Sequence, residues 1–224
     1  MSITDKLLLI YERLHQCYGP LHWWPADEPF EVMVGAILTQ SAAWGNVEKA
    51  IANLKAAGIL SLKGLRELPI EALSRLVYPS GYYNAKAKKL KALVEYLGES
   101  YGDDLARLFA QDVFKLREEL LAVHGIGNET ADSILLYAAG KPIFVIDAYT
   151  KRLIFRLGLS LEGDSYLSLQ ALFMGRLPPD PQMFNEYHAL IVQHGKGVCR
   201  KRPLCPQCCI LDICPYGQTI EGEC

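Results

Sequence analysis

Residues 120–132 read Leu120-Leu121-Ala122-Val123-His124-Gly125-Ile126-Gly127-Asn128-Glu129-Thr130-Ala131-Asp132, and the longer stretch around them, residues 116–156, decides the fold. Apolar periodicity predicts one helix that ends at Val123 and another that begins near Thr130. Between them, two glycines let the chain reverse through left-handed conformations, and the isoleucine can pack into the core. The next helix then begins with bare N–H groups, which favour an anion. Such a helix–hairpin–helix can bind a DNA phosphate, although a lone Gly-x-Gly is more often an ordinary glycine-capped connection.

A second signal follows the hairpin. The short apolar run at residues 142–146 leads directly to Asp147, which stands at the start of a helix beginning Ala148-Tyr149-Thr150. Aspartate is a common N-cap residue, because its carboxylate accepts hydrogen bonds from the first N–H groups of a helix. A carboxylate at that place can also face a substrate. The two roles are compatible.

The composition is that of an ordinary globular protein. Of the 224 residues, 50% are hydrophobic and 21% are charged, which is enough for a core in one large or two small domains. The formal net charge of −2 gives no global basic field, so any contact with nucleic acid must come from local basic patches. We see neither a signal-peptide pattern nor an apolar run of about 18 residues, and therefore expect a cytoplasmic protein with no membrane contact.

Apolar periodicity predicts an almost all-α fold. The expected helices cover residues 4–17, 30–40, 47–54, 61–67, 69–77, 85–101, 103–109, 112–123, 148–157, 164–175 and 183–195. The only strand-like run, residues 143–146, is too short to found a sheet. The helix at 85–101 carries a run of lysines, namely Lys86, Lys88, Lys89 and Lys91. Such a run is usually a solvated face and less often a DNA-flanking one.

Two early segments indicate surfaces that meet a partner. Trp23-Trp24-Pro25 places two tryptophans side by side, and these cannot point the same way on a regular element. At least one of them then lines a surface or cleft, unless both close the core between helices. The buried helix at 30–40 ends in polar residues around Gln40, and an isolated Trp44 follows. This arrangement is typical of a loop that faces a partner.

These motifs together resemble a known family. Val123-His124-Gly125-Ile126-Gly127 with Thr130-Ala131, followed by Val145-Ile146-Asp147-Ala148-Tyr149, is similar to the helix–hairpin–helix base-excision DNA glycosylase superfamily, to which endonuclease III belongs. The resemblance implies an all-α, two-lobed fold. A six-helix barrel domain with the hairpin is expected at residues 27–136. A discontinuous helical domain with the catalytic aspartate and an iron–sulfur cluster loop is expected at residues 1–26 and 137–224.

The resemblance also implies roles for individual residues. Asp147 matches the aspartate beside the target sugar, where it stabilises an oxocarbenium ion or activates water. Gln40 matches the glutamine of the loop that fills the gap left by an extruded base. The implied hairpin contacts to DNA are His124, Gly125, Ile126 and Gly127. Glu129 stands where strand-cutting members carry a nucleophilic lysine, and since a carboxylate cannot form an imine, a monofunctional glycosylase is expected.

A more specific match extends to about residue 196. It includes Trp23-Trp24-Pro25, Phe30-Glu31, the run at 35–40, the run at 79–84, residues 125–129 and His194-Gly195-Lys196. Together these are similar to the 3-methyladenine DNA glycosylase III type. That type implies a base pocket formed by Trp23, Trp24, Pro25, Trp44 and Lys196. An N-methylated purine is cationic, so an aromatic pocket attracts it. The adenine-mismatch branch needs a carboxylate near Gly35 and Ala36, which this chain lacks.

The cysteines form the second strong motif. Five of the seven fall in Cys199-x5-Cys205-x2-Cys208-Cys209-x4-Cys214, which in a cytosolic chain indicates zinc or a [4Fe–4S] cluster more than disulfides. Endonuclease III-like members end in Cys-x6-Cys-x2-Cys-x5-Cys, so the resemblance implies iron rather than zinc. The implied ligands are Cys199, Cys205, Cys208 and Cys214, with Cys209 conceivable in place of Cys208. The cluster would be structural and would present Lys196, Arg200, Lys201 and Arg202 to phosphates. Cys17 and Cys224 are not assigned.

Two other hypotheses remain open. One is a glycosylase of the same fold that acts on another damaged or mismatched base, with lyase activity from Lys196. The other is a non-catalytic DNA-binding iron–sulfur protein. In every case the expected partner is double-stranded damaged DNA. We expect a monomer in the cytoplasm, associated with the nucleoid if the source is bacterial.

Overall fold

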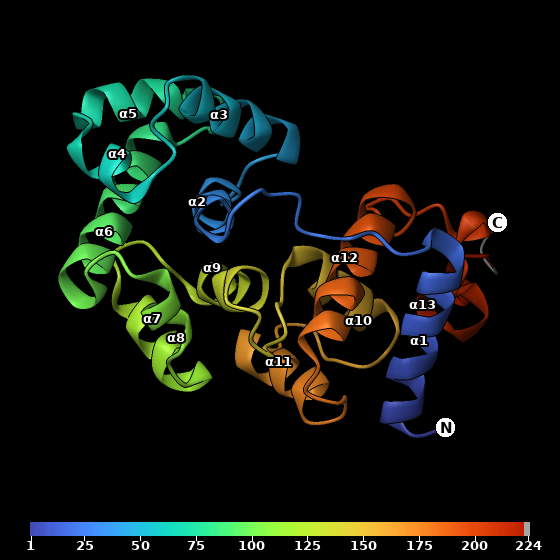
Figure 1. Cartoon of the computed structure of the whole chain (residues 1–224). Coiled ribbons are helices and arrows are strands. Elements are labelled where there is room, and N and C mark those ends of the chain that lie inside the picture. The colour runs from blue at the N-terminus through green and yellow to red at the C-terminus, as the bar shows by residue number, and fades with distance from the viewer. Residues whose placement is uncertain (222–224) are drawn as a thin grey trace. The chain divides into compact units, whose positions relative to one another are not determined.

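The computed structural model describes residues 1–221 and divides the chain into two compact units (Figure 1). Trp24–Lys141 forms one, here called the inserted unit. Met1–Trp23 and the chain from Pro142 onward form the other, here called the discontinuous unit. The divisions thus fall at 23/24 and 141/142 rather than at the expected 26/27 and 136/137. Residues 222–224, and with them Cys224, lie outside the described part.

The inserted unit is built around one apolar helix. Its elements are α2 (Pro29–Leu38), α3 (Trp44–Ala56), α4 (Leu62–Glu67), α5 (Ile70–Leu76), η1 (Tyr78–Ser80), α6 (Tyr83–Tyr101), α7 (Leu105–Phe109), α8 (Val113–Ala122), α9 (Asn128–Ser133) and η2 (Ile134–Ala138). Every residue of α2 from Phe30 to Leu38 is buried, because α3, α6, α9 and η2 all contact it. The proline at the first position of α2 suits a helix start, where its missing N–H costs nothing.

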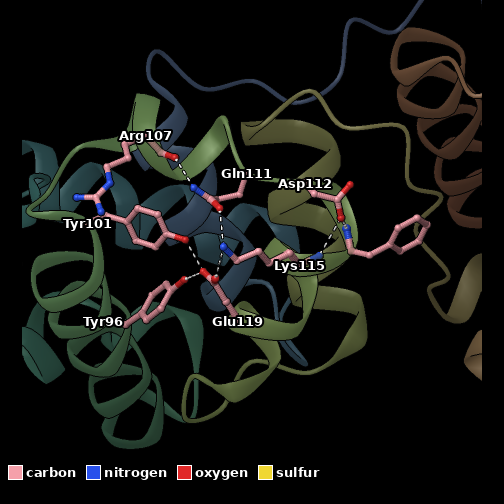
Figure 2. Close-up of polar contacts among 8 residues, drawn as sticks. Tyr96, Tyr101, Arg107, Gln111, Asp112, Lys115 and Glu119 are labelled. Atoms are coloured by element: carbon pink, nitrogen blue, oxygen red, sulfur yellow. Dashed lines mark hydrogen bonds and ion pairs between the residues drawn. The ribbon is translucent and has the colours of Figure 1, made fainter.

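A carboxylate with two tyrosines fixes α8, the first helix of the hairpin (Figure 2). Figure 2 shows Tyr96 and Tyr101 of α6 converging on Glu119 of α8. The Tyr96 hydroxyl donates to Glu119 Oε2 at 2.7 Å, and the Tyr101 hydroxyl donates to the same oxygen. These bonds lower the pKa of Glu119. Because hydrogen bonds to a charged acceptor are the stronger kind, they anchor α8 at its middle.

The discontinuous unit joins the first helix to the last part of the chain. Its elements are α1 (Ile3–Tyr18), α10 (Ala148–Arg156), α11 (Tyr166–Met174), α12 (Pro181–Gly197), η3 (Cys205–Gln207), η4 (Leu211–Ile213) and α13 (Pro215–Glu221). Both α1 and α10 contact α12 (Figure 1). The core of this unit is aromatic, with Phe144 stacked on Phe173 at 3.9 Å between ring centroids. The buried Tyr187 hydroxyl of α12 donates to Leu7 O of α1 at 2.8 Å.

Residues 143–146 are buried, but they form no regular element and pair with no strand. Within residues 1–221 the structure has no β-strand, so the predicted all-α fold is confirmed. Side chains of α11 supply hydrogen bonds that a strand partner would otherwise give. Gln170 Nε2 donates to Phe144 O at 2.8 Å, and the Tyr166 hydroxyl accepts from Ile146 N at 3.3 Å. Among the helices of residues 1–221, none has the length and apolarity needed to cross a membrane.

Candidate functional site

The hairpin lies between α8 and α9 in the inserted unit. Gly125 has φ +82°, a left-handed conformation that glycine adopts without strain. Ile126 is 5% exposed, and its N–H donates to Val123 O at 3.1 Å, so it packs into the core as predicted. Gly127 is different from the prediction. It has φ −99° and ψ −179°, which is extended backbone, because it serves as the N-cap of α9 rather than as part of the reversal.

An arginine ties the two helices of the hairpin together. Arg117 of α8 donates from Nε to Asp132 Oδ1 at 2.7 Å and from Nη2 to Asp132 Oδ2 at 3.1 Å. A further bond runs from Arg117 Nη2 to Asn128 Oδ1 at 2.9 Å. Asp132 is fully buried. This pair was not predicted from the sequence. A charged residue inside the apolar run of the second helix was the available signal, because buried carboxylates are normally paired.

The outer side of the hairpin is exposed. His124, Gly127 and Glu129 are all solvent-exposed, and Gly127 offers no capping side chain to α9. The first N–H groups of α9 therefore lack the intrahelical acceptors that later residues have, which suits an anion. Glu129 lies in the first turn of α9.

Gln40 lies against this hairpin. It follows α2, and its Nε2 donates to Gly125 O at 3.1 Å and to Thr130 Oγ1 at 2.9 Å. Lys89 Nζ of α6 donates to Gln40 Oε1. The residue expected to enter a gap in DNA is thus folded onto the hairpin in this structure.

The lysine run on α6 is not the solvated face that was expected, except at Lys88, which is exposed. Lys86 is only 1% exposed, and its Nζ donates to Leu38 O at 2.8 Å and to Ser80 O at 2.6 Å. Lys91 Nζ donates to Arg66 O at 2.6 Å. Burial lowers the pKa of Lys86 to about 8, and the charge of Lys89 contributes. These ammonium groups close the open carbonyl ends of neighbouring turns, a role that local charge patterning could not reveal.

Three aromatic rings gather beside α2. The rings of Trp24 and Trp44 meet edge to face at 5.2 Å and 84°, and Trp24 also lies 5.2 Å from the ring of Tyr137. Gly35 of α2 makes room for Trp24, since a Cβ there would come within 3.1 Å of the indole Cζ2. Pro25 is exposed. Tyr137 was missed by the sequence analysis because it lies in the π-helical turn η2, which breaks the 3.6-residue period.

Trp23 belongs to the discontinuous unit, so the two adjacent tryptophans lie in different units. Lys196 Nζ lies 5.5 Å from the centroid of the Trp23 ring, which is a cation–π distance. Lys196 is exposed at the end of α12. The backbone beside it is fixed by α10, because Arg152 Nη2 donates to Gly195 O at 2.9 Å.

Asp147 is the N-cap of α10, as its position predicted. Its Oδ1 accepts from Thr150 N at 2.7 Å and from Thr150 Oγ1 at 2.9 Å. Its Oδ2 lies 3.8 Å from Nε2 of His188, a buried histidine of α12. Burial lowers the pKa of His188, while the charge of Asp147 acts in the opposite direction. The two carboxylate oxygens therefore have different surroundings: one completes the helix cap, and the other faces a buried imidazole.

Four of the clustered cysteines share one pocket. Cys199, Cys205, Cys208 and Cys214 line it, together with Leu153, Arg156, Val198 and Ile210. Cys209 does not line this pocket and instead hydrogen-bonds to Cys17 of α1. Cys208 accepts a backbone hydrogen bond from Ile210, and Cys214 accepts two, from Gly217 and Tyr216. N–H groups aimed at sulfur suit thiolates, so the pocket fits a thiolate-bound iron–sulfur cluster. In residues 1–221 no three Cys, His, Asp or Glu side chains converge as they would around a single metal ion.

Arg156, at the end of α10, holds the loop that contains this pocket. Its Nη1 donates to Cys199 Sγ at 3.3 Å and to Arg200 O at 2.7 Å, and its Nη2 donates to Lys201 O at 3.1 Å. The side chains of Arg200, Lys201 and Arg202 are exposed. Their backbone is thus fixed while their charges face solvent, which is what phosphate contacts require.

Comparison with known proteins agrees with this fold and its motifs. A family model described as HhH-GPD superfamily base excision DNA repair protein matches residues 34–179. A relative from Methanocaldococcus jannaschii, provisionally named DNA repair glycosylase MJ1434, is 46% identical over 212 residues, which cover 94% of this chain and 96% of the relative. Endonuclease III of Sulfolobus acidocaldarius is 29% identical over 189 residues, 84% of this chain and 82% of its own. The chain belongs to the HhH-GPD superfamily of base excision DNA repair proteins.

Two solved structures are informative. An endonuclease III–DNA covalent intermediate superposes with a TM-score of 0.85 over 99% of this chain and 100% of that one, at 22% identity, which shows the shared fold. The H. pylori 3-methyladenine DNA glycosylase MagIII, bound to 1,N6-ethenoadenine, superposes with a TM-score of 0.73 at 30% identity. That match covers 88% of this chain and 98% of the H. pylori chain.

Proposed function

We propose that this chain is a monofunctional DNA glycosylase that hydrolyses the N-glycosidic bond of alkylated purines of the 3-methyladenine type in double-stranded DNA. The observation that carries the proposal is the cluster of Trp24, Trp44 and Tyr137 rings beside α2. A cationic N-methylated purine gains about 1–2 kcal/mol from cation–π contact with each well-placed ring, whereas its neutral counterpart gains only stacking. The similarity to the H. pylori 3-methyladenine glycosylase supports this substrate class.

Trp24, Pro25 and Trp44 are the base-pocket residues of the inserted unit in this proposal. Trp23 and Lys196 form their own pair in the discontinuous unit. Their assignment to base binding stays a prediction.

Asp147 is the proposed catalytic residue. After the nucleotide is flipped out of the duplex, the C–N bond breaks and positive charge develops on the sugar. The carboxylate stabilises that charge or takes a proton from the attacking water. Thr150 holds one oxygen of Asp147, which fixes the orientation of the group. Burial keeps the nearby His188 neutral, so this histidine does not compete with the sugar for the negative charge of Asp147.

The absence of strand cleavage is proposed from Glu129. This residue occupies the first turn of α9, at the place where the resemblance puts a lysine nucleophile. A carboxylate cannot form a Schiff base, so the abasic site would remain intact.

The four pocket cysteines Cys199, Cys205, Cys208 and Cys214 would hold a [4Fe–4S] cluster. When bound, the cluster would cross-link the loop and would take no part in the chemistry at the base. Around it, Arg156 fixes the backbone, and Arg200, Lys201 and Arg202 would contact phosphates. The hairpin residues His124, Gly125, Ile126 and Gly127 would contact a further phosphate. We propose a monomer that acts on DNA in the cytoplasm.

A base-release assay over a panel of duplexes tests the function. We expect release of 3-methyladenine from methylated DNA, and loss of release by at least about 100-fold in Asp147→Asn. Asparagine is as good an N-cap as aspartate, so the variant should fold normally. Asp180→Asn is the matched control, because Asp180 caps α12 of the same unit through its own side chain. Full activity of folded Asp147→Asn would refute the catalytic assignment.

The similarity to endonuclease III supports a second candidate, a glycosylase with lyase activity on another damaged or mismatched base. Borohydride trapping separates the two. A covalent adduct with DNA that disappears in Lys196→Gln would establish the lyase and refute the monofunctional proposal. DNA binding without release of any base would instead indicate a non-catalytic DNA-binding iron–sulfur protein.

A further inference from the structure

Every polar group of the Gln40 side chain is engaged by the hairpin or by α6. A primary amide has two N–H donors and one carbonyl oxygen. In Gln40 the nitrogen donates to Gly125 O at 3.1 Å and to Thr130 Oγ1 at 2.9 Å, and the oxygen accepts from Lys89 Nζ. For Gln40 to enter a gap in DNA, these bonds must break.

Lys89 reaches Gln40 by lying across the hairpin. A Cβ on Gly125 would come within 2.4 Å of Lys89 Cγ, 2.6 Å of Cδ and 2.7 Å of Cε. The aliphatic stem therefore covers Gly125 along three carbons, and this places the ammonium group beside the hairpin. The neighbouring Lys88 on the same helix is exposed instead.

The surroundings of Lys89 favour an anion. Its hydrogen-bond acceptor is a neutral amide, and the nearby Lys86 likewise donates to the neutral oxygens of Leu38 and Ser80. The two ammonium groups are close enough for the charge of Lys89 to lower the pKa of Lys86. An ammonium group binds a phosphate oxygen more strongly than an amide oxygen, because both partners are then charged.

We propose that Lys89 is a DNA-phosphate-binding residue, and that phosphate takes its ammonium group from Gln40. Gln40 is then held on the hairpin by its two Nε2 bonds alone, which makes its release easier. Binding of the DNA backbone and filling of the gap are thereby coupled. The inference rests on the proposed function, in which the hairpin meets a phosphate and Gln40 fills the gap. Lys89 is a binding and positioning residue, and no chemistry at the base is assigned to it.

The contact between the Lys89 ammonium group and a phosphate is tested by the salt dependence of binding. The DNA is a duplex that contains a tetrahydrofuran abasic analogue. In Lys89→Met the unbranched stem can still cover Gly125, so only the ammonium group is lost. The slope of log K against log salt is negative, and we expect its magnitude to decrease by about 0.9, the value of one phosphate contact. Lys88→Met is the matched control and should keep the wild-type slope. An unchanged slope in Lys89→Met, or an equal loss in Lys88→Met, would overturn the phosphate contact.

The breaking of the Lys89–Gln40 bond on binding is tested by a double-mutant cycle with Gln40→Ala and Lys89→Met on the same duplex. Each single substitution also removes the Lys89–Gln40 bond that binding must break, which partly offsets its loss of affinity. The product of the two single effects counts this offset twice, whereas the double variant gains it only once. Its affinity should therefore fall below the product of the two single effects by about 10-fold or more, the worth of one hydrogen bond to a charged group.

A double variant that equals the product would show that the Lys89–Gln40 bond survives binding and would overturn the coupling. The pair Lys88→Met and Gln40→Ala should give the simple product. Binding to this duplex requires no excision. Absence of alkylpurine release would refute the proposed substrate and leave this experiment interpretable.

Discussion

Replacement of Arg117 by methionine should loosen the hairpin more than any substitution of an exposed arginine. Arg117 is 14% exposed, and its guanidinium group makes two bonds to Asp132, which is fully buried. Methionine keeps much of the volume of the side chain but removes the charge. The carboxylate of Asp132 then remains buried without its cation, and Asn128 loses the bond at the start of α9.

The expected loss follows from the burial of the remaining charge. Breaking a buried ion pair on one side costs about 3–5 kcal/mol, and the slight exposure of Arg117 favours the lower figure, about 3 kcal/mol. With a urea m-value of about 1.5 kcal/mol per molar for a unit of this size, the unfolding midpoint should fall by about 2 M. Arg117→Lys keeps the charge but cannot form the bidentate hydrogen bond to Asp132. Its loss of unfolding free energy should therefore be smaller than that of Arg117→Met.

Urea unfolding followed by circular dichroism measures this loss. The control is Arg75→Met, since Arg75 is an exposed arginine on α5 of the same unit and its removal should cost less than about 0.5 kcal/mol. Amide hydrogen exchange at residues 126–130 should rise in Arg117→Met alone. If Arg117→Met moves the midpoint no further than Arg75→Met does, the pair does not hold the hairpin and the reasoning is wrong.

Three further predictions concern the cluster loop, a buried lysine and the aromatic group. The purified Cys208→Ser variant should have lost most of its iron, whereas Cys209→Ser should keep about four iron atoms per chain. The reason is that Cys208 lines the pocket and Cys209 does not. Equal iron content in the two variants would refute this assignment. Burial lowers the pKa of Lys86 from 10.5 to about 8. Between these two pH values the unfolded chain binds more protons than the folded chain does. The unfolding free energy should therefore rise with pH in that range, by on the order of 1–3 kcal/mol. Urea titrations at about pH 7.5 and about pH 10 should show this rise in the wild type and not in Lys86→Met. Gly35→Ala should displace Trp24 and reduce release of 3-methyladenine by about 10-fold, whereas Gly45→Ala, whose Cβ would meet only Glu48 Oε2 at 3.9 Å, should not.

Local patterns predicted much of this fold because the interactions behind them are local. The reversal at Gly125, the buried Ile126 and the cap at Asp147 depend on residues within a few positions, so they follow from the sequence. The conformation of Gly127 could not be predicted in this way, because a glycine before a helix can be either left-handed or extended. The all-α class followed from the apolar periodicity. The prediction that residues 143–146 form no sheet was also correct.

Partners that are distant in sequence were the part that could not be predicted. The burial of Lys86 depends on the carbonyl oxygens of Ser80 and of Leu38, and Leu38 lies 48 positions away in the sequence. Cys208 and Cys209 are adjacent and chemically identical, and the fold alone turns one toward the pocket and the other toward Cys17. Tyr137 joined the aromatic group through a π-helical turn that has no clear sequence signature.

The discontinuous unit imposes an order on biosynthesis. A ribosome releases α1 well before the α12 residues that pack against it. Tyr187, for example, bonds to Leu7 O and emerges 180 positions later. The inserted unit, by contrast, has all of its chain available once Lys141 has left the exit tunnel. We therefore expect the nascent protein to pass through a stage in which the hairpin is already folded while α1 waits with Leu7, Ile10 and Leu14 uncovered. At that stage α1 is a target for chaperones.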